Sequence, residues 1–191
     1  MKTQEQIDKI KAVVLYILQH FPNGLDYVKL FKIMYFAQRS YLTEYGICII
    51  EDTFKARQKG PVPALTYKVM KKVEGGESFE ECFDLNDFAS SISVDEDQIV
   101  KAIKKPDMDY IADMEVECLD KTIGQYANVD SNDLSKLSHD GAYNKVKRRM
   151  KDDPEKDVLT AIDIARAGGA EKQTIDYIRD VQLIKSAFHA Y

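Results

Sequence analysis

Residues 25–46 read LDYVKLFKIMYFAQRSYLTEYG, and this stretch decides the fold of the 191-residue chain. Its apolar side chains recur at three- and four-residue steps, which predicts a helix that opens at Leu25 or Asp26 and stops at Gly46. The stripe consists of Leu30, Ile33, Met34, Ala37 and Tyr41, widened by Phe31, Tyr35 and Phe36. Because burial of each large apolar side chain contributes roughly 1.5 to 3 kcal/mol, we expect this helix at the centre of the core.

The segments on either side predict a helix before it and a β-hairpin after it. Thr3 and Gln6 have capping-box spacing ahead of the apolar series Ile7, Ile10, Val14, Ile17 and Phe21, and 22–24 (PNG) ends that helix. Residues 47–50 (ICII) and 53–57 (TFKAR) are the two strand candidates, joined by Glu51-Asp52. The turn 60–63 (GPVP) then closes the hairpin, and Pro63 suits the first turn of a third helix.

The remaining chain predicts further helices and one long loop. Residues 74–93 are expected to form a loop with a short helix or strand around 79–88, and Ser93 with Glu96 to cap a helix that reaches Lys104. Asp107 is expected to cap a helix that turns inward Ile111, Met114, Cys118, Leu119, Ile123 and Tyr126. A short helix is expected at 131–137. Beyond Pro154 we expect two helical segments, 155–167 and 171–189, and the second has an apolar side made of Ile175, Ile178, Leu183 and Ile184.

The expected fold is mainly α (α+β): a compact helical domain with a small hairpin between its second and third helices.

Charge and cysteine content restrict the class of protein. The net charge of −5 divides into +6 for residues 1–73, −13 for 74–133 and +2 for 134–191. Such an acidic middle repels phosphate and disfavours nonspecific nucleic-acid binding unless the two basic ends converge in the fold. The three cysteines are too few and too widely spaced for a disulfide framework, and no apolar signal or membrane-spanning run is evident. We therefore expect a cytoplasmic protein.

The sequence contains few patterns that are typical of a catalytic site or a metal site. The cysteines and the three histidines show no paired metal-ligand spacing, so we expect neither metal nor cofactor. Cys48 and Cys118 have the surroundings of small core side chains, and the acidic neighbours of Cys82 disfavour its thiolate. Asp109, Asp113 and Glu117 fall at four-residue spacing and offer a divalent-cation or acid/base site, against the commoner interpretation of a solvated helix face.

Two other features invite a binding role. The basic run Lys145, Lys147, Arg148, Arg149 and Lys151 is the best nucleic-acid candidate, although Asp152 and Asp153 follow it directly. The turn 60–63 and the segment 137–139 place rigid or polar residues between regular elements. Backbone roles explain such residues most often, and contact with a partner is the alternative.

Three motifs in order, Lys29–Gln38 (KLFKIMYFAQ), Phe54–Val62 (FKARQKGPV) and Leu134–His139 (LSKLSH), resemble the Panacea, or SocA-like, antitoxin domain. That family has a K-L-x-K-L-x-Y-F-A-Q helix, a strand leading into a G-P-V turn, and an L-S-H element. The resemblance covers roughly 25–143, within an expected domain of 1–150 that a helical extension, 151–191, packs against. Arg57 and Tyr143 stand where family members often carry tryptophan, so the identity of the partner is not carried over.

The resemblance implies a mainly helical domain without enzymatic activity that neutralises a cognate protein toxin encoded beside it in bacterial or prophage genes. Some members capture the toxin directly, and some act as adaptors that deliver it to a protease. The expected contact surface comprises Phe54, Arg57, Lys59, Gly60, Pro61, Val62, Ser138, His139 and Tyr143. Among these, Arg57, Lys59 and Tyr143 are predicted as anchors, because exposed arginine and tyrosine dominate many interfaces. A nucleic-acid-binding regulator that uses 145–151 is the alternative.

Overall fold

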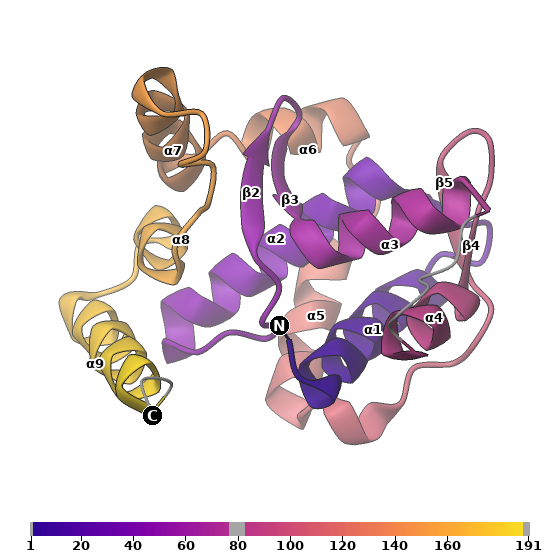
Figure 1. Cartoon of the computed structure of the whole chain (residues 1–191), viewed down its shortest axis with the longest axis horizontal. Coiled ribbons are helices and arrows are strands. Elements are labelled where there is room, and N and C mark those ends of the chain that lie inside the picture. Colours follow the sequence, from indigo (N-terminus) through magenta and orange to yellow (C-terminus); the bar gives the residue numbers. More distant parts are fainter. Residues whose placement is uncertain (1, 77–82, 189–191) are drawn as a thin grey trace.

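The computed structural model describes residues 2–76 and 83–188, and its architecture is mainly helical with two small antiparallel sheets (Figure 1). Helix α2 (Tyr27–Tyr45) runs through the middle of the molecule and is buried on almost every side. Asp26 caps it by accepting a hydrogen bond from the Lys29 backbone at 3.0 Å, and Gly46 ends it in the left-handed conformation. The predicted fold class and the central position of this helix are confirmed.

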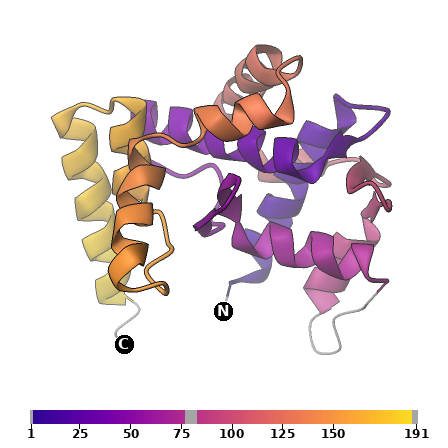
Figure 2. The ribbon, with the colours of Figure 1, turned by 90° about the horizontal axis from the view of Figure 1, so that it is seen from above.

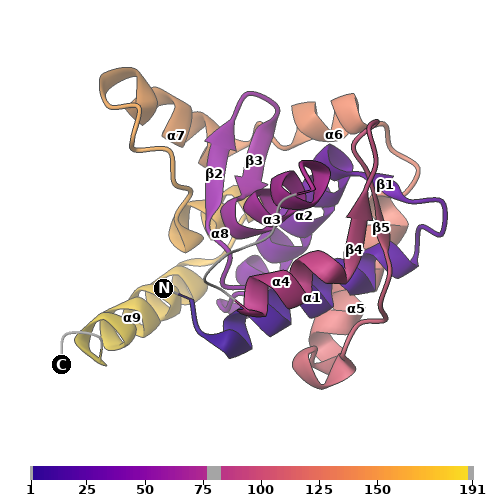
Figure 3. The ribbon, with the colours of Figure 1, turned by 45° about the vertical axis from the view of Figure 1, so that its right-hand side comes forward.

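Helix α1 (Gln4–Gln19) begins as predicted, with Thr3 and Gln6 forming a reciprocal capping box. The C-terminal half of α1 is buried on every side, since residues 12–18 are all buried, and helix α4 (Phe83–Ser90) packs against α1, as Figure 3 shows. Residues 77–82, which include Cys82 and the start of the region 79–88, lie outside the described residues.

Of the two predicted hairpin strands, 53–57 is confirmed as a strand and 47–50 is wrong. The observed pair is β2 (Phe54–Arg57) with β3 (Gly60–Pro63), so the residues expected to form the closing turn are themselves a strand. Residues 47–50 are not a strand, because the side chain of Gln38 occupies their backbone groups: its Oε1 accepts from the backbone N–H of Ile49 and Ile50, and its Nε2 donates to the Ile50 carbonyl. A buried amide on α2 thus replaces a strand partner.

Helix α3 (Ala64–Glu74) follows β3 directly, with Pro63 at the cap position. Proline offers no side-chain oxygen, and the buried Asp52 supplies it from outside the helix. The Asp52 carboxylate accepts from the backbone N–H of Leu65 at 2.9 Å and of Thr66 at 3.0 Å, and from the Thr66 hydroxyl at 2.8 Å. The free N–H groups at the start of α3 are thereby satisfied.

The helix predicted after Ser93 is wrong: this region is a second hairpin, β4 (Ile92–Val94) with β5 (Ile99–Ala102). The Asp95 side chain accepts from the backbone of Asp97 and Ile99 and organises the turn, and Gln98 adopts a φ of 65°. On its other edge β5 pairs with β1 (Leu25–Asp26), a strand just before α2. Pairing with β1 favours the strand conformation of β5. The spacing of Ser93 and Glu96 is a local signal and does not reveal this distant partner.

Asp107 caps a short 3-10 helix, η1 (Met108–Tyr110), whereas helix α5 (Asp113–Tyr126) begins later, with Ala112 at its cap position. The predicted inward face of α5 is correct for Leu119 and Ile123, which are buried, and wrong for Met114, which is exposed. The prediction of one helix capped by Asp107 is therefore also wrong.

Helix α6 (Ser131–Leu137) matches its predicted range, and α7 (Gly141–Asp152) carries the basic run. Residues 155–160, expected to be helical, are not: 154–155 form a turn and 157–159 run along β2, so α8 (Ala161–Gly168) is shorter than predicted. Helix α9 (Lys172–Phe188) buries Ile175 and Ile178, but Leu183 and Ile184 are exposed, so its apolar face is shorter than predicted.

Helices α7, α8 and α9 stand together at one side of the molecule, and the β2–β3 hairpin lies between them and α3 (Figure 2). Helix α8 packs across α2, where Gly168 leaves no room for a side chain beside Thr43. The Thr43 hydroxyl lies 2.7 Å from the Arg39 carbonyl and 3.4 Å from the Ala165 carbonyl. The C-terminal helices thus cover part of the central helix.

Candidate protein-interaction site

The tip of the β2–β3 hairpin projects between α7 and α6, with Gln58 and Lys59 at its turn (Figure 1). Arg57 and Gly60 are the last paired residues before the turn. All three motifs quoted above meet here, because α2 supplies the floor under the hairpin and α6 ends beside it.

Gly60 permits the close approach of these three elements. Its φ is +102°, a conformation that residues with a side chain rarely adopt. A Cβ at this position would collide with Ser138 Oγ and lie 3.1 Å from Lys32 Nζ. Gly60 is therefore a backbone requirement, which explains a glycine in the G-P-V turn.

Lys32, on α2, is fully buried beneath β3 and donates to the Pro61 carbonyl at 2.7 Å. Burial, with a further contribution from Lys59, lowers the pKa of Lys32 from 10.5 to about 7. No carboxylate pairs with this amine among the described residues. Sequence reasoning missed its role, and the only signal was a lysine inside an otherwise apolar stripe.

Residues of α6 and α7 hold the tip from its other side. Ser135 Oγ donates to the Lys59 carbonyl at 2.8 Å, and the Tyr143 hydroxyl donates to the Arg57 carbonyl at 2.9 Å. The His139 ring stacks on the Tyr143 ring, with centroids 4.2 Å apart. Burial lowers the pKa of His139, and the nearby Lys32 and Lys147 act in the same direction. These contacts fix the backbone of the tip.

The predicted site residues separate into supporting and exposed groups. Arg57 and Lys59 are exposed, and Val62 and His139 are half-buried. The expectation that Tyr143 is exposed is wrong: it is 5% exposed, and its hydroxyl supports the tip from below. The others are also buried, namely Phe54, Gly60, Pro61 and Ser138. Only some of the predicted contact residues are therefore accessible to a partner protein. That they contact such a partner stays a prediction.

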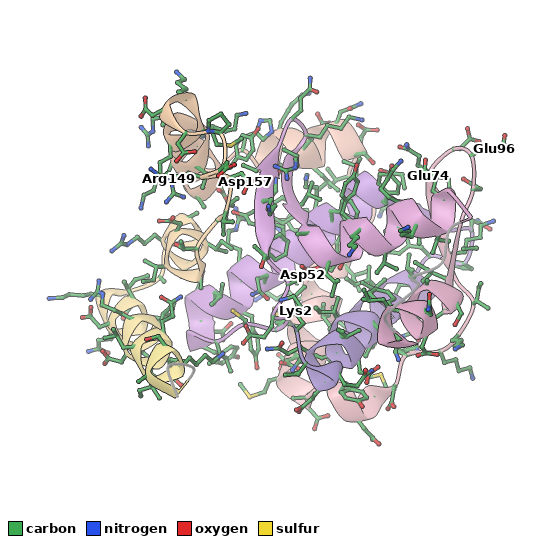
Figure 4. All side chains as sticks on the ribbon, viewed as in Figure 1. Lys2, Asp52, Glu74, Glu96, Arg149 and Asp157 are labelled. Atoms are coloured by element: carbon green, nitrogen blue, oxygen red, sulfur yellow. The ribbon has the colours of Figure 1, made fainter. Side chains whose placement is uncertain are left out.

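Residues 157–159 cover the outer edge of β2. Ala56 donates to the Asp157 carbonyl at 2.7 Å, and Leu159 to the Phe54 carbonyl at 2.9 Å. The Asp157 carboxylate lies 2.7 Å from Arg57 Nη1 and 3.5 Å from Lys55 Nζ. Figure 4 shows Asp157 between α7 and β2. The backbone of residues 157–159 therefore covers the free edge of β2, and the Asp157 carboxylate fixes the orientation of the Arg57 guanidinium.

Asp140 joins α2 to α7 and was also missed by sequence reasoning. Its carboxylate accepts from the Tyr35 hydroxyl and the Arg39 guanidinium, each at 2.8 Å, and from the backbone N–H of Ala142 and Tyr143. Burial, followed by the Asp140 charge, raises the pKa of Tyr35. An aspartate directly after L-S-H, ahead of a helix, was the available signal.

The basic run on α7 is partly occupied within the chain. Lys145 Nζ lies 2.6 Å and Arg149 Nη2 3.6 Å from the buried Asp163 carboxylate, and Arg149 also donates to the Val158 carbonyl. Lys147, Arg148 and Lys151 remain exposed. Two of the five cations therefore hold α8 and the preceding segment.

The proposed catalytic alternatives do not assemble within residues 2–76 and 83–188. Asp109 lies in η1 and Asp113 begins α5, so they do not share a helix with four-residue spacing, and no group of three potential ligands is placed to hold a metal. Burial raises the pKa of Cys48 to about 11 and also raises that of Cys118. Neither thiol is primed as a nucleophile.

In the part of the chain that the structure covers, no helix has both the length and the apolar character needed to span a membrane.

Comparison with protein families gives one match. The family model described as "Antitoxin SocA-like, Panacea domain" matches residues 30–143, more than half of the chain. Comparisons with curated proteins and with solved structures give no significant match. The matched range runs from α2 to the start of α7 and contains the hairpin tip with its supports. The chain therefore belongs to the SocA-like antitoxin family that is defined by the Panacea domain.

Proposed function

We propose that the protein is a cytoplasmic, non-catalytic antitoxin that binds and neutralises a protein toxin encoded beside it. The observation that carries this proposal is the family match over residues 30–143. We assign the domain to 1–150, with 151–191 as a helical extension packed on it.

The contact surface in this proposal is the hairpin tip. Arg57 and Lys59 are exposed there, Val62 and His139 are half-buried, and hydrogen bonds from Lys32, Ser135 and Tyr143 hold the backbone. A surface that is ordered before binding loses less conformational entropy when a partner docks. Phe54, Gly60, Pro61, Ser138 and Tyr143 contribute through this support.

Co-expression with the adjacent gene tests the function. The wild-type chain is expected to restore growth of cells that express the toxin and to retain it in a pull-down. Charge reversal by Lys59→Glu is expected to weaken binding by about tenfold or more. Lys105→Glu, an exposed site beyond the end of β5, is the matched control. Absence of both rescue and retention for the wild-type chain contradicts the proposal.

The same cells distinguish capture from delivery to a protease. Direct capture, which we propose, leaves the half-life of the toxin unchanged when the antitoxin is induced. A shortened half-life that depends on a cellular protease assigns the adaptor mechanism instead. A salt titration with DNA tests the alternative function, since binding through α7 would weaken steeply as salt rises.

A further inference from the structure

A cavity of about 380 Å³ opens beside the hairpin tip, in the angle between α2, α3 and β3. Tyr27, Phe31 and Tyr67 form its aromatic wall, and Val62 adds an aliphatic side. The rings of Tyr27 and Phe31 are stacked at 5.5 Å, and Tyr67 stands edge-on to Phe31 at 6.1 Å. Tyr67 is 39% exposed, so the wall is open to a partner.

The charged residues that line the cavity are all cationic. Arg57 and Lys59 stand at the hairpin side, and Lys32 is buried on the inner side. The other lining residues are neutral, and none is an aspartate or glutamate. Asp157 pairs with Arg57, whereas Lys32 and Lys59 have no carboxylate partner among the described residues.

The two amines also act on each other. Burial is the main cause of the lowered pKa of Lys32, and the positive charge of Lys59 acts in the same direction, as expected for two amines that face one cavity. A negative group at the mouth of the cavity would attract both amines and favour the charged form of Lys32. The aromatic wall offers edge-to-face packing to a further ring in the same space.

We propose that this cavity receives an aromatic side chain of the toxin that is flanked in the toxin sequence by aspartate or glutamate. The inference rests on the proposed function and adds the chemistry of the anchor. The ring enters between Tyr67 and Val62, and the flanking carboxylates meet Lys59 and Arg57. Buried aromatic anchors next to matched charges are the usual source of binding energy at protein interfaces.

Photo-crosslinking in the full chain tests the inference. Tyr67 is replaced by p-benzoylphenylalanine, and the chain is co-expressed with the toxin from the adjacent gene. The control is the same replacement at Tyr177, an exposed tyrosine on α9. We expect a crosslink from position 67 and none from 177. Mass spectrometry is expected to locate it in a toxin segment that contains an aromatic residue with acidic neighbours.

Affinity measurements give a second readout. Tyr67→Ala and Lys59→Glu are each expected to raise the Kd for the toxin by about tenfold or more, whereas Tyr177→Ala and Lys105→Glu stay within about twofold. Circular dichroism melting verifies that all four variants are folded.

Failure of the inference is distinguishable from failure of the proposed function. If the wild-type chain binds the toxin but Tyr67→Ala binds equally well, or if position 67 crosslinks to nucleic acid or to a toxin segment without an aromatic residue and carboxylates, the inference is overturned and the antitoxin function stands. If the wild-type chain does not bind the toxin, the proposed function fails with it.

Discussion

At the scale of single residues, the hairpin tip depends on one buried lysine, Lys32, and on one glycine with a positive φ, Gly60. Lys32 is a lysine without solvent access, and Gly60 is required where a Cβ would collide with Ser138 Oγ and crowd the Lys32 amine. Both belong to the motifs that resemble the family, so these motifs include residues that support the hairpin tip. Separate substitutions of Gly60 and Lys32 measure what each contributes to the free energy of unfolding.

Gly60→Ala is expected to destabilise the fold by roughly 3 kcal/mol or more, because it combines an unfavourable φ with a collision against buried groups. The matched control is Gly124→Ala in α5, where a Cβ meets nothing within 4 Å and the helix gains roughly 0.5 to 1 kcal/mol. Urea denaturation of both variants measures the difference. Equal stability of the two would contradict the close approach at Gly60.

Lys32 is expected to make stability rise with pH. The folded chain releases the Lys32 proton near pH 7, whereas the unfolded chain holds it until about 10.5, so the unfolded state binds more protons between these values. The free energy of unfolding should increase from pH 7 to pH 9.5 by roughly 2 to 3 kcal/mol, at most about 1.4 kcal/mol per pH unit.

Urea denaturation across this pH range checks the prediction. Lys32→Met is expected to abolish the increase, while Lys101→Met, an exposed lysine on β5, retains it. A slope that survives in Lys32→Met would mean that another group titrates.

At the scale of elements, local signals predicted the ends of α2 and α6 and the start of α1, but not the starts of α5 and α8. The Thr3–Gln6 box, the Asp26–Gly46 limits of α2 and the whole of α6 depend on residues within one turn of each end. The β elements were predicted poorly. The backbone of 47–50 is held by Gln38, and β5 pairs with β1 from far earlier in the chain. Such partners are invisible to local spacing.

Asp52→Ala is expected to loosen α3 and lower stability by roughly 2 to 3 kcal/mol, since it leaves two backbone N–H groups and the Thr66 hydroxyl without their acceptor. Asp133→Ala removes an exposed pair with Lys136 and is expected to cost less than about 0.5 kcal/mol. Thermal melting compares them, and hydrogen exchange of the α3 amides localises the effect. Unchanged exchange in α3 would contradict the capping role.

At the scale of the whole molecule, the residues after Pro154 close two open surfaces. Residues 157–159 cover the edge of β2, and α8 covers the side of α2 near Thr43. The buried Asp163 carboxylate, paired with Lys145 and Arg149, holds these parts together. Removing this region would expose both the hairpin and the central helix.

A chain that ends at Asp153 is therefore expected to lose cooperative thermal melting or to melt at least about 10 °C lower. A chain that ends at Asp180 removes the exposed Leu183 and Ile184 and should melt within about 3 °C of the full chain. Circular dichroism melting measures both. If the shorter chain melts like the full one, residues 154–191 are an appendage and not part of the core.

The sequence by itself determined the central helix, the caps of α1 and α2 and the three motifs that identify the family, because these follow from apolar periodicity and neighbours within a turn. Only the tertiary structure decided which motif residues are reachable. Tyr143 is buried under the tip, Lys32 lies beneath β3 and Asp157 reaches Arg57 from the C-terminal region. The exposure of a side chain depends on which distant segments of the chain pack over it. The local sequence around that residue does not indicate which segments these are.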